Sequence, residues 1–265
     1  MEAFLTHIVR LAAAVALASG VSIGPAHAAD LQPETIAAFD RYVRLTEQRM
    51  AADPYARVAH RPLGALFIEP AVTRDRGNDI DVPGGLIHHW VGGVFVPGAT
   101  VDEAVALLQD YDRHAEIYAP TVARSRVLAR NGDTFRVYLR FLMKKVITVV
   151  VNSEHEARFT RDGPGRARSR IVSTRIAEVE EPGTPEEREK PVGRDGGYLW
   201  RLNTYWRFVE RDNGVYVECE SITLTRGIPT GFGWLVRPFV TSIPRESLTF
   251  TLERTRARLA AEQRR

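Results

Sequence analysis

The feature that most constrains the fold is a long stretch of strand-like sequence at residues 122–226. Turn signals divide it at Asn131-Gly132, at Asp162-Gly163 and at Asn213-Gly214, and a weaker turn falls at Lys144-Lys145. Between these turns the sequence is rich in β-branched and aromatic residues, which favour strands. Short turns between consecutive strands predict antiparallel pairing. Strands are expected at residues 135–143, 146–159, 167–179, 198–209 and 215–225, with a charged loop at 180–197.

Helical periodicity precedes this stretch in two places. Apolar residues recur near every fourth position within residues 33–52, which predicts an amphipathic helix. Thr100 and Glu103 form a capping-box pattern, in which each side chain bonds the backbone of the other residue. This pattern predicts a helix from residue 101 to about 118, ended by Pro120. A strand is expected at 86–96, and residues 53–82 are irregular apart from a short strand near 66–68.

The C-terminal residues 230–262 are expected to form a helix in two pieces. Pro238 and Pro244 lack a backbone N–H, so a break is expected at these prolines. Pro244 fits the first turn of the second piece. Beyond it, apolar residues fall at intervals of three and four positions and form one stripe that must face a sheet. The stripe consists of Leu248, Leu252, Thr255 and Leu259.

The order of these elements predicts the fold class. A strand and a capped helix come first, then consecutive antiparallel strands, then a long helix with one apolar stripe. This order is typical of α+β domains in which helices pack on a sheet. We therefore expect a curved antiparallel sheet of about six or seven strands, wrapped on the C-terminal helix.

The last predicted hairpin can be divided into two faces. If Asn213-Gly214 is its two-residue turn, Arg207 lies opposite Glu220. Opposite charges across strands stabilise a sheet modestly, so the face that also carries Glu218 is expected to lie in water. The other face is apolar with a few hydroxyl groups, which is typical both of a ligand-pocket wall and of a packed core. Its members are Trp200, Leu202, Thr204, Trp206, Phe208, Val217, Cys219, Ser221 and Thr223.

The first residues of the chain predict export. Arg10 precedes an apolar run at 11–23, and Ala26-His27-Ala28 has the small-x-small form found before a cleavage site. The run is about 13 residues long, whereas a helix that crosses a bilayer needs roughly 20. We expect a signal peptide at 1–28, an N-terminal extension at 29–81, and a periplasmic or secreted location for the mature chain.

Charge and cysteine content exclude several classes of function. The 265 residues include 36 basic and 33 acidic side chains, with a net charge of +3 and no basic tract of the kind that follows phosphates. A nucleic-acid partner is therefore not expected. Cys219 is the only cysteine, which excludes an intramolecular disulfide and a cysteine-based zinc site. The sequence contains no nucleotide-binding, metalloprotease or calcium-loop motif, and no metal or cofactor is expected.

Four runs of residues resemble the START-like (SRPBCC) superfamily. GFGWLVRPF at 231–239, followed by SIPRESL at 242–248, is similar to the C-terminal helix of START-like proteins. VPGGLIHHW at 82–90 and STRIAEV at 173–179 are similar to bacterial members, which include polyketide cyclase-like and lipid-transfer-like groups. The resemblance implies a helix-grip domain at 82–262, with a cavity between sheet and long helix. Members bind lipids, sterols, polyketides or other apolar molecules, and some are enzymes.

Several titratable side chains are candidates for chemistry. Asp110, His114 and Tyr118 lie near the end of the capped helix and could form an acid–base group at a cavity mouth. The i, i+4 spacing puts Asp110 and His114 on one helix face, and the alternative is a solvated helix end. His88 and His89 are adjacent in a predicted strand, so they point to opposite faces and are not expected to share a metal ion.

A second group, Glu154, His155 and Glu156, alternates across a predicted strand. Only the two glutamates share a face, so the three residues do not form a catalytic triad.

Three functions are compatible with these observations. The first is an exported carrier or sensor of an apolar or lipid-like small molecule, held between the sheet and the C-terminal helix. The second is a cyclase- or hydrolase-type enzyme on the same fold. The third is a non-catalytic interaction module with a filled cavity, in which Arg237 and Arg245 contact membrane head groups. The ligand-binding residues expected for the first are Trp200, Leu202, Thr204, Trp206, Ser221, Thr223, Trp234 and Phe239.

Overall fold

The computed structural model describes residues 29–59, 64, 66–144, 148–227 and 233–263, and only the backbone of Ala29, Ala59 and residues 233–241. Its centre is an antiparallel sheet that contains nine strands among these residues, in the order β2-β5-β13-β12-β9-β8-β7-β6, with β10 pairing with β9. Two of the strands are short, β2 (Phe67–Pro70) and β10 (Arg188–Glu189). The long strands are β5 (Gly85–Pro97), β6 (Val122–Asn131), β7 (Thr134–Lys144), β8 (Thr148–Arg161), β9 (Arg166–Glu180), β12 (Arg201–Arg211) and β13 (Gly214–Arg226).

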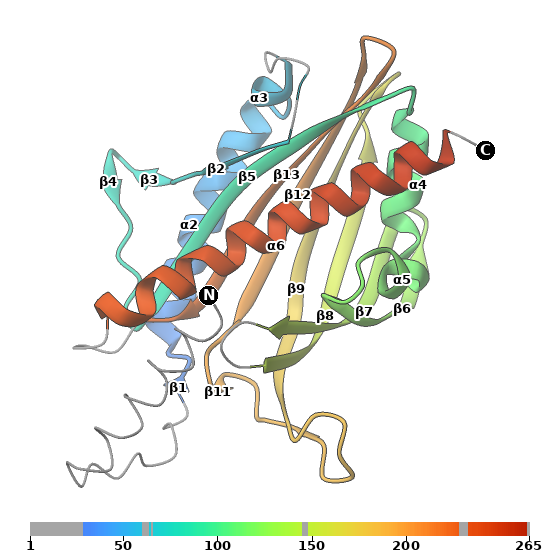
Figure 1. Cartoon of the computed structure of the whole chain (residues 1–265). Helices are drawn as coiled ribbons and strands as arrows, with labels where there is room; N and C mark the ends of the chain where they lie inside the picture. Colours follow the sequence, from blue (N-terminus) through green and yellow to red (C-terminus); the bar gives the residue numbers. More distant parts are fainter. Residues whose placement is uncertain (1–28, 60–63, 65, 145–147, 228–232, 264–265) are drawn as a thin grey trace, which may run out of the picture.

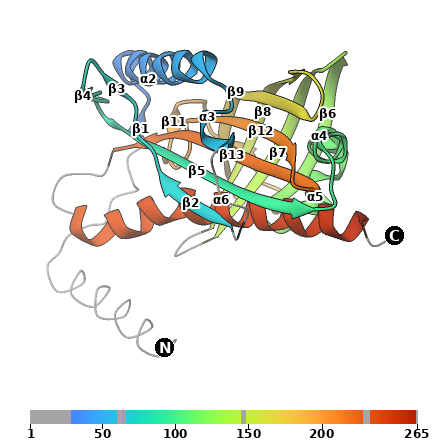
Figure 2. The ribbon, with the colours of Figure 1, turned by 90° about the horizontal axis from the view of Figure 1, so that it is seen from above.

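The sheet curves around one long helix, α6 (Gly233–Glu262), which crosses its inner face (Figure 1). A second helix, α2 (Pro33–Ala52), lies on the outer face, and Figure 2 shows the sheet between the two. This is a helix-grip arrangement. The expected α+β fold, a curved antiparallel sheet wrapped on the C-terminal helix, is therefore confirmed.

The C-terminal helix is continuous over 30 residues, so the expected division into two pieces is wrong. Pro238 and Pro244 both lie within it. Each proline removes one backbone donor, but the hydrogen bonds of the neighbouring residues can continue the helix past both sites.

The apolar stripe of α6 faces the sheet, as its spacing predicts. Leu248, Leu252, Thr255 and Leu259 are at most 5% exposed, and the three leucines belong to the largest hydrophobic core. Burial of a leucine side chain stabilises the fold by roughly 2 kcal/mol. A Cβ atom at Gly92 of β5 would lie only 2.8 Å from Leu252 Cδ1, so glycine allows α6 to approach the sheet closely.

Residues 29–81 add a second layer on the outer face. The helix α2 begins and ends at the predicted residues. Its Phe39, Tyr42 and Val43 pack with Ile222 and Leu224, which lie on the outer side of β13. The shorter elements of this segment are α3 (Ala56–Ala59), β3 (Arg74–Asp75), β4 (Asn78–Asp79) and β1 (Ala29–Asp30), which pairs with β11 (Arg194–Asp195).

The capped helix is shorter than predicted. The capping box is present: Thr100 N–H donates to the Glu103 carboxylate at 2.7 Å, and Glu103 N–H donates to Thr100 Oγ1 at 3.2 Å. However, α4 (Val101–Gln109) is followed by a 3-10 turn, η1 (Tyr111–Arg113), and by α5 (His114–Ile117). Asp112 in this turn accepts a hydrogen bond from Val127 N–H of β6 at 2.8 Å. This contact ties the turn to the sheet and accounts for the interrupted helix.

The predicted register of the last hairpin is wrong by two positions. Asp212 and Asn213 are the turn residues, both with positive φ, and Arg211 pairs with Gly214. Asp and Asn tolerate this conformation. Gly214 is needed for another reason, because a Cβ atom there would lie 2.9 Å from Pro97 Cα of β5. A shift of two positions keeps every side chain on its predicted face.

Two predictions lie outside the described residues: the signal peptide at 1–28 and the turn that begins at Lys144-Lys145. Within the part of the chain that the structure describes, no helix is both long and apolar enough to span a membrane.

Candidate functional site

Two rows of side chains cross the middle of the inner sheet face. In the first row Ile171 of β9, Thr204 of β12, Ser221 of β13 and Trp90 of β5 are successive cross-strand neighbours. Each residue is only partly buried. This row therefore joins two hydroxyl groups to apolar surface that solvent still reaches.

The second row lies beside the first. His155 of β8 is paired with Ser173 of β9, and the Ser173 hydroxyl accepts a hydrogen bond from Leu202 N–H of β12 at 3.0 Å. Leu202 is paired with Thr223 of β13, and Thr223 with His88 of β5. We call the two rows together the inner band; it consists of Trp90, Ile171, Thr204, Ser221, His88, His155, Ser173, Leu202 and Thr223.

The inner band is the open part of the sheet–helix interface. Towards the other end of the strands, Val94, Val96, Phe208 and Val217 are at most 1% exposed and form a filled core with α6. In the band, six of the nine residues are partly accessible. The helix runs alongside β5, because Leu252 lies against Gly92 and Gln263 lies near Gly98. The N-terminal half of α6 therefore lies over the end of the band that β5 and β13 form.

His155 is held in one tautomer by its neighbours. The Ser153 hydroxyl donates its single proton to the Leu139 carbonyl at 2.9 Å. The 2.9 Å bond between His155 Nε2 and Ser153 Oγ must then have the histidine as its donor. Burial lowers the pKa of His155 to about 4, so the ring is neutral at pH 7. The Nδ1 atom consequently carries a lone pair, and no described residue donates to it.

The opposite end of the band has a second neutral histidine. The Thr225 hydroxyl donates to the Arg226 carbonyl at 3.3 Å, so the His88 Nε2 atom donates to Thr225 Oγ1 at 3.1 Å. Burial lowers the pKa of His88 to about 4. All nine residues of the band are therefore uncharged at neutral pH. They could hold a neutral apolar molecule, but they provide no cation for a carboxylate or phosphate group.

Two further polar groups on the inner face lack a hydrogen-bond partner among the described residues. They are the hydroxyl groups of Ser169 and Thr223, whose residues are 5% and 8% exposed. A buried hydroxyl without a partner costs about 1–3 kcal/mol. Such groups are expected where a ligand or ordered water completes the hydrogen bonding.

Five of the eight residues expected to bind a ligand lie on the inner face: Leu202, Thr204, Trp206, Ser221 and Thr223. The assignment of Trp200 to this face is wrong. It precedes β12 and packs in the outer core with residues of α2, where its indole N–H donates to Asp195 at 3.0 Å. Trp234 and Phe239 lie on α6, in the part whose side chains are outside the description.

The three acid–base candidates are not brought together. The α4 helix ends at Gln109 and α5 begins at His114, so Asp110 and His114 do not share one helix face, contrary to the prediction from their spacing. The Asp110 carboxylate is partly exposed and lies 3.4 Å from Arg113 in an ion pair. It also lines a surface cavity of about 450 Å³ between α4 and β6.

His114 and Tyr118 are buried beneath α6. Their ring centroids are 5.1 Å apart, and Tyr111 lies 4.6 Å from His114 on its other side. Burial lowers the pKa of His114 to about 4 and raises the pKa of Tyr118. The Tyr118 hydroxyl is 3.0 Å from Thr255 Oγ1 on α6. Two neutral aromatic groups without a neighbouring carboxylate form a packing contact rather than an acid–base pair.

The charged face of the last hairpin is buried, so the expectation that it lies in water is wrong. The side chains of Glu218 and Glu220 are fully buried, and that of Arg207 is 6% exposed. Arg207 binds both glutamates, at 3.0 and 3.3 Å. Arg49 of α2 also binds Glu220, and Arg57 of α3 lies 3.8 Å from it. The N-terminal extension thus covers these charges and supplies two cations to them.

A hydrogen-bond chain completes this outer cluster. The Tyr42 hydroxyl accepts from Thr73 N–H at 2.8 Å and lies 2.9 Å from His89 Nδ1. His89 Nε2 lies 2.7 Å from the Glu220 carboxylate. Burial favours neutral His89 and lowers its pKa. Burial alone would raise the pKa of Glu220, but the His89 hydrogen bond and the nearby guanidinium groups lower it to about 2.

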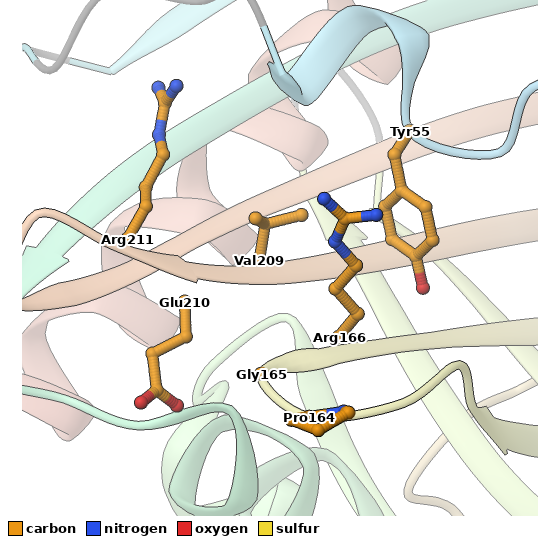
Figure 3. A pocket seen from close by; sticks show the side chains of 7 residues that line it. All are labelled: Tyr55, Pro164, Gly165, Arg166, Val209, Glu210 and Arg211. Carbon is orange, nitrogen blue, oxygen red and sulfur yellow. The ribbon is translucent and has the colours of Figure 1, made fainter.

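A second cavity, of about 340 Å³, lies at the end of the β9–β12 pair (Figure 3). The Arg166 guanidinium lies 5.5 Å from the centre of the Tyr55 ring, and Figure 3 shows it pointing towards that ring, with Glu210 directed away. Glu210 accepts from Val101 N–H at 3.1 Å, and the Tyr55 hydroxyl donates to Asp162 at 2.7 Å. Arg166, Glu210 and the Tyr55 hydroxyl each have a contact partner within the protein. Among the described residues, no group of three His, Cys, Asp or Glu side chains could hold a metal ion.

In comparisons with known proteins, no family model and no curated protein matches the chain. Among solved structures, it is similar to a STAR-related lipid transfer protein from Xanthomonas axonopodis, with 18% identity and a TM-score of 0.47 over 72% of this chain and 98% of that one. It is also similar to the Zhui aromatase/cyclase from Streptomyces, with 13% identity and a TM-score of 0.43 over 66% of this chain and 94% of that one. A START superfamily protein from Mycobacterium smegmatis is similar with 9% identity and a TM-score of 0.41 over 66% of this chain and 96% of that one.

Proposed function

We propose that the chain is an exported carrier of a neutral, apolar small molecule, which binds between the inner band and the N-terminal half of α6. The observation that carries the proposal is the difference between the two ends of the inner face. One end is a filled core, whereas the inner band combines partly accessible apolar side chains with hydroxyl groups. This composition is typical of small-molecule sites.

The uncharged character of the band favours this class of ligand. Burial of an unpaired anion in an apolar site is very costly, and the band has no cation to compensate. Export is the part of the proposal that depends on the sequence alone, through residues 11–28.

Direct binding tests the proposal. The purified full chain is stripped of bound molecules with organic solvent, refolded, and titrated with long-chain alcohols, sterols and isoprenoids. Material bound before stripping is extracted and identified by mass spectrometry. Saturable binding at one site per chain is the expected result, and the absence of both binding and co-purified ligand would contradict the proposal.

A pair of variants locates the site. Ser221→Phe places a large side chain in the inner band and is expected to abolish binding. Arg158→Phe adds the same side chain at an exposed position on the outer face of β8 and is expected to leave binding unchanged. Equal binding by wild type and Ser221→Phe would place the ligand elsewhere.

A further inference from the structure

The His155 side chain lies on the inner face of the sheet, next to the open part of the interface. It is 2% exposed, and its ring packs edge-on against Phe141, with 6.3 Å between the ring centroids. The flanking inner residues Ala157 and Phe159 belong to the core beneath α6. The imidazole therefore lies on the inner face of the sheet, beside this core.

The hydrogen bonds of its neighbours determine what His155 can offer a ligand. Ser153 uses its proton on the Leu139 carbonyl, so His155 Nε2–H donates to Ser153. The opposite ring nitrogen, Nδ1, is a lone-pair acceptor that lacks a donor among the described residues. A buried polar atom without a partner is uncommon in folded proteins and costs stability. The fold thus leaves one acceptor with a fixed position and direction.

We propose that the ligand carries a hydroxyl group, and that this hydroxyl donates a hydrogen bond to His155 Nδ1. The proposal rests on the proposed function, because it names the chemical class of the ligand at the same site. That class is the neutral, long-chain apolar alcohol. The apolar body would lie along Leu202, Ile171 and Trp90, which continue from His155 across the band.

The same geometry disfavours other lipid classes. A carboxylate has no proton to donate at neutral pH and would face the Nδ1 lone pair of a neutral ring. A methyl ether has the shape of the alcohol but also lacks the proton. A site built to bond a polar group rejects an analogue that leaves this group unpaired.

The test compares 1-dodecanol, dodecyl methyl ether and dodecanoate on the full chain by isothermal titration calorimetry. We expect the alcohol to bind about tenfold more tightly than the ether, and dodecanoate to bind more weakly than both. In His155→Phe the ratio of the affinity for the alcohol to the affinity for the ether is expected to fall to about one. His155→Asn keeps an acceptor near the Nδ1 position, so it is expected to restore part of this preference for the alcohol.

A spectroscopic readout tests the same contact in the wild-type chain. The ¹⁵N signal of His155 Nδ1 is expected to shift when dodecanol binds and to move less with the ether. Equal affinities for alcohol and ether, or a preference that survives in His155→Phe, would overturn the alcohol proposal and leave the carrier function intact. Failure of all three probes to bind would instead contradict the carrier function and the alcohol proposal together.

Discussion

The buried Glu220 carboxylate allows a quantitative prediction. It lies under α2, where His89, Arg207 and Arg49 all contact it. These groups lower its pKa from 4.5 to about 2, a difference that corresponds to about 3 kcal/mol between the charged and neutral forms. Removal of one partner from a buried ion pair costs a similar amount, about 3–5 kcal/mol. Glu220→Gln is therefore expected to lower the free energy of unfolding by about 3 kcal/mol at neutral pH.

The assay is urea unfolding followed by tryptophan fluorescence over a range of pH. Because the folded-state pKa of Glu220 lies below the unfolded value, the stability that it contributes is present above about pH 4.5 and is lost as the pH falls towards 2. The difference in the free energy of unfolding between wild type and Glu220→Gln should therefore decrease by about 1.4 kcal/mol when the pH falls from about 6 to about 3.5.

Glu218 provides a matched control on the same strand and face. Burial, together with the charge of Glu220, raises the pKa of Glu218. Because the pKa of Glu218 is higher in the folded state than in the unfolded state, ionisation of Glu218 lowers the free energy of unfolding as the pH rises. Glu218→Gln should therefore be no less stable than wild type at neutral pH. The reasoning is refuted if both variants lose the same stability, or if the loss in Glu220→Gln does not depend on pH.

Two further predictions follow from the structure and one from the sequence. Leu252→Ala should lower the free energy of unfolding in urea by about 3 kcal/mol, because Leu252 is fully buried between α6 and β5. As a control, Arg256→Ala on the exposed side of α6 should change this free energy by less than about 0.5 kcal/mol. His114 and His155 have pKa values lowered to about 4 by burial, so their imidazole NMR signals should not titrate between about pH 8 and pH 5.5, and titration near pH 6.5 would show that they are solvated. N-terminal sequencing of the exported chain should begin at Ala29, and an intact Met1 in the exported fraction would contradict cleavage.

The elements of the fold were largely predictable because periodicity records which face of an element is buried. The helix at residues 33–52 was predicted to the residue, and the stripe from Leu248 to Leu259 faces the sheet as expected. The division of β12 and β13 into two faces also held, because the register error was an even number of residues. Side-chain alternation depends only on the sequence within each strand.

The environment of each face was less predictable. The residues Arg207, Glu218 and Glu220 have the composition of a solvated face, and nothing local to their strands shows that α2 covers them. Their burial depends on Arg49 and Arg57, which are more than 160 positions away from Glu220 in the sequence. Long-range pairing of this kind leaves no periodic signal, so the pattern within the two strands predicts a solvated face.

The candidate site shows the same division between local and long-range information. Strand alternation correctly predicted that His155 points to the opposite face from Glu154 and Glu156, which excluded a catalytic triad. It did not indicate that His155 alone is a candidate binding residue. Its importance depends on Ser153, whose proton is used by the Leu139 carbonyl on the neighbouring strand. Trp200 was misplaced for a related reason: it lies before β12 begins, where strand alternation does not apply.

The most direct test of the central claim is the response of the tryptophan indole signals in ¹H–¹⁵N NMR spectra during titration with 1-dodecanol. Trp90 and Trp206 lie on the inner face, whereas Trp200 lies in the outer core under α2. Binding between the inner band and α6 predicts that the signals of Trp90 and Trp206 shift to saturation while that of Trp200 stays fixed. A shift confined to Trp200, or no shift of any of the three, would contradict a ligand site on the inner face.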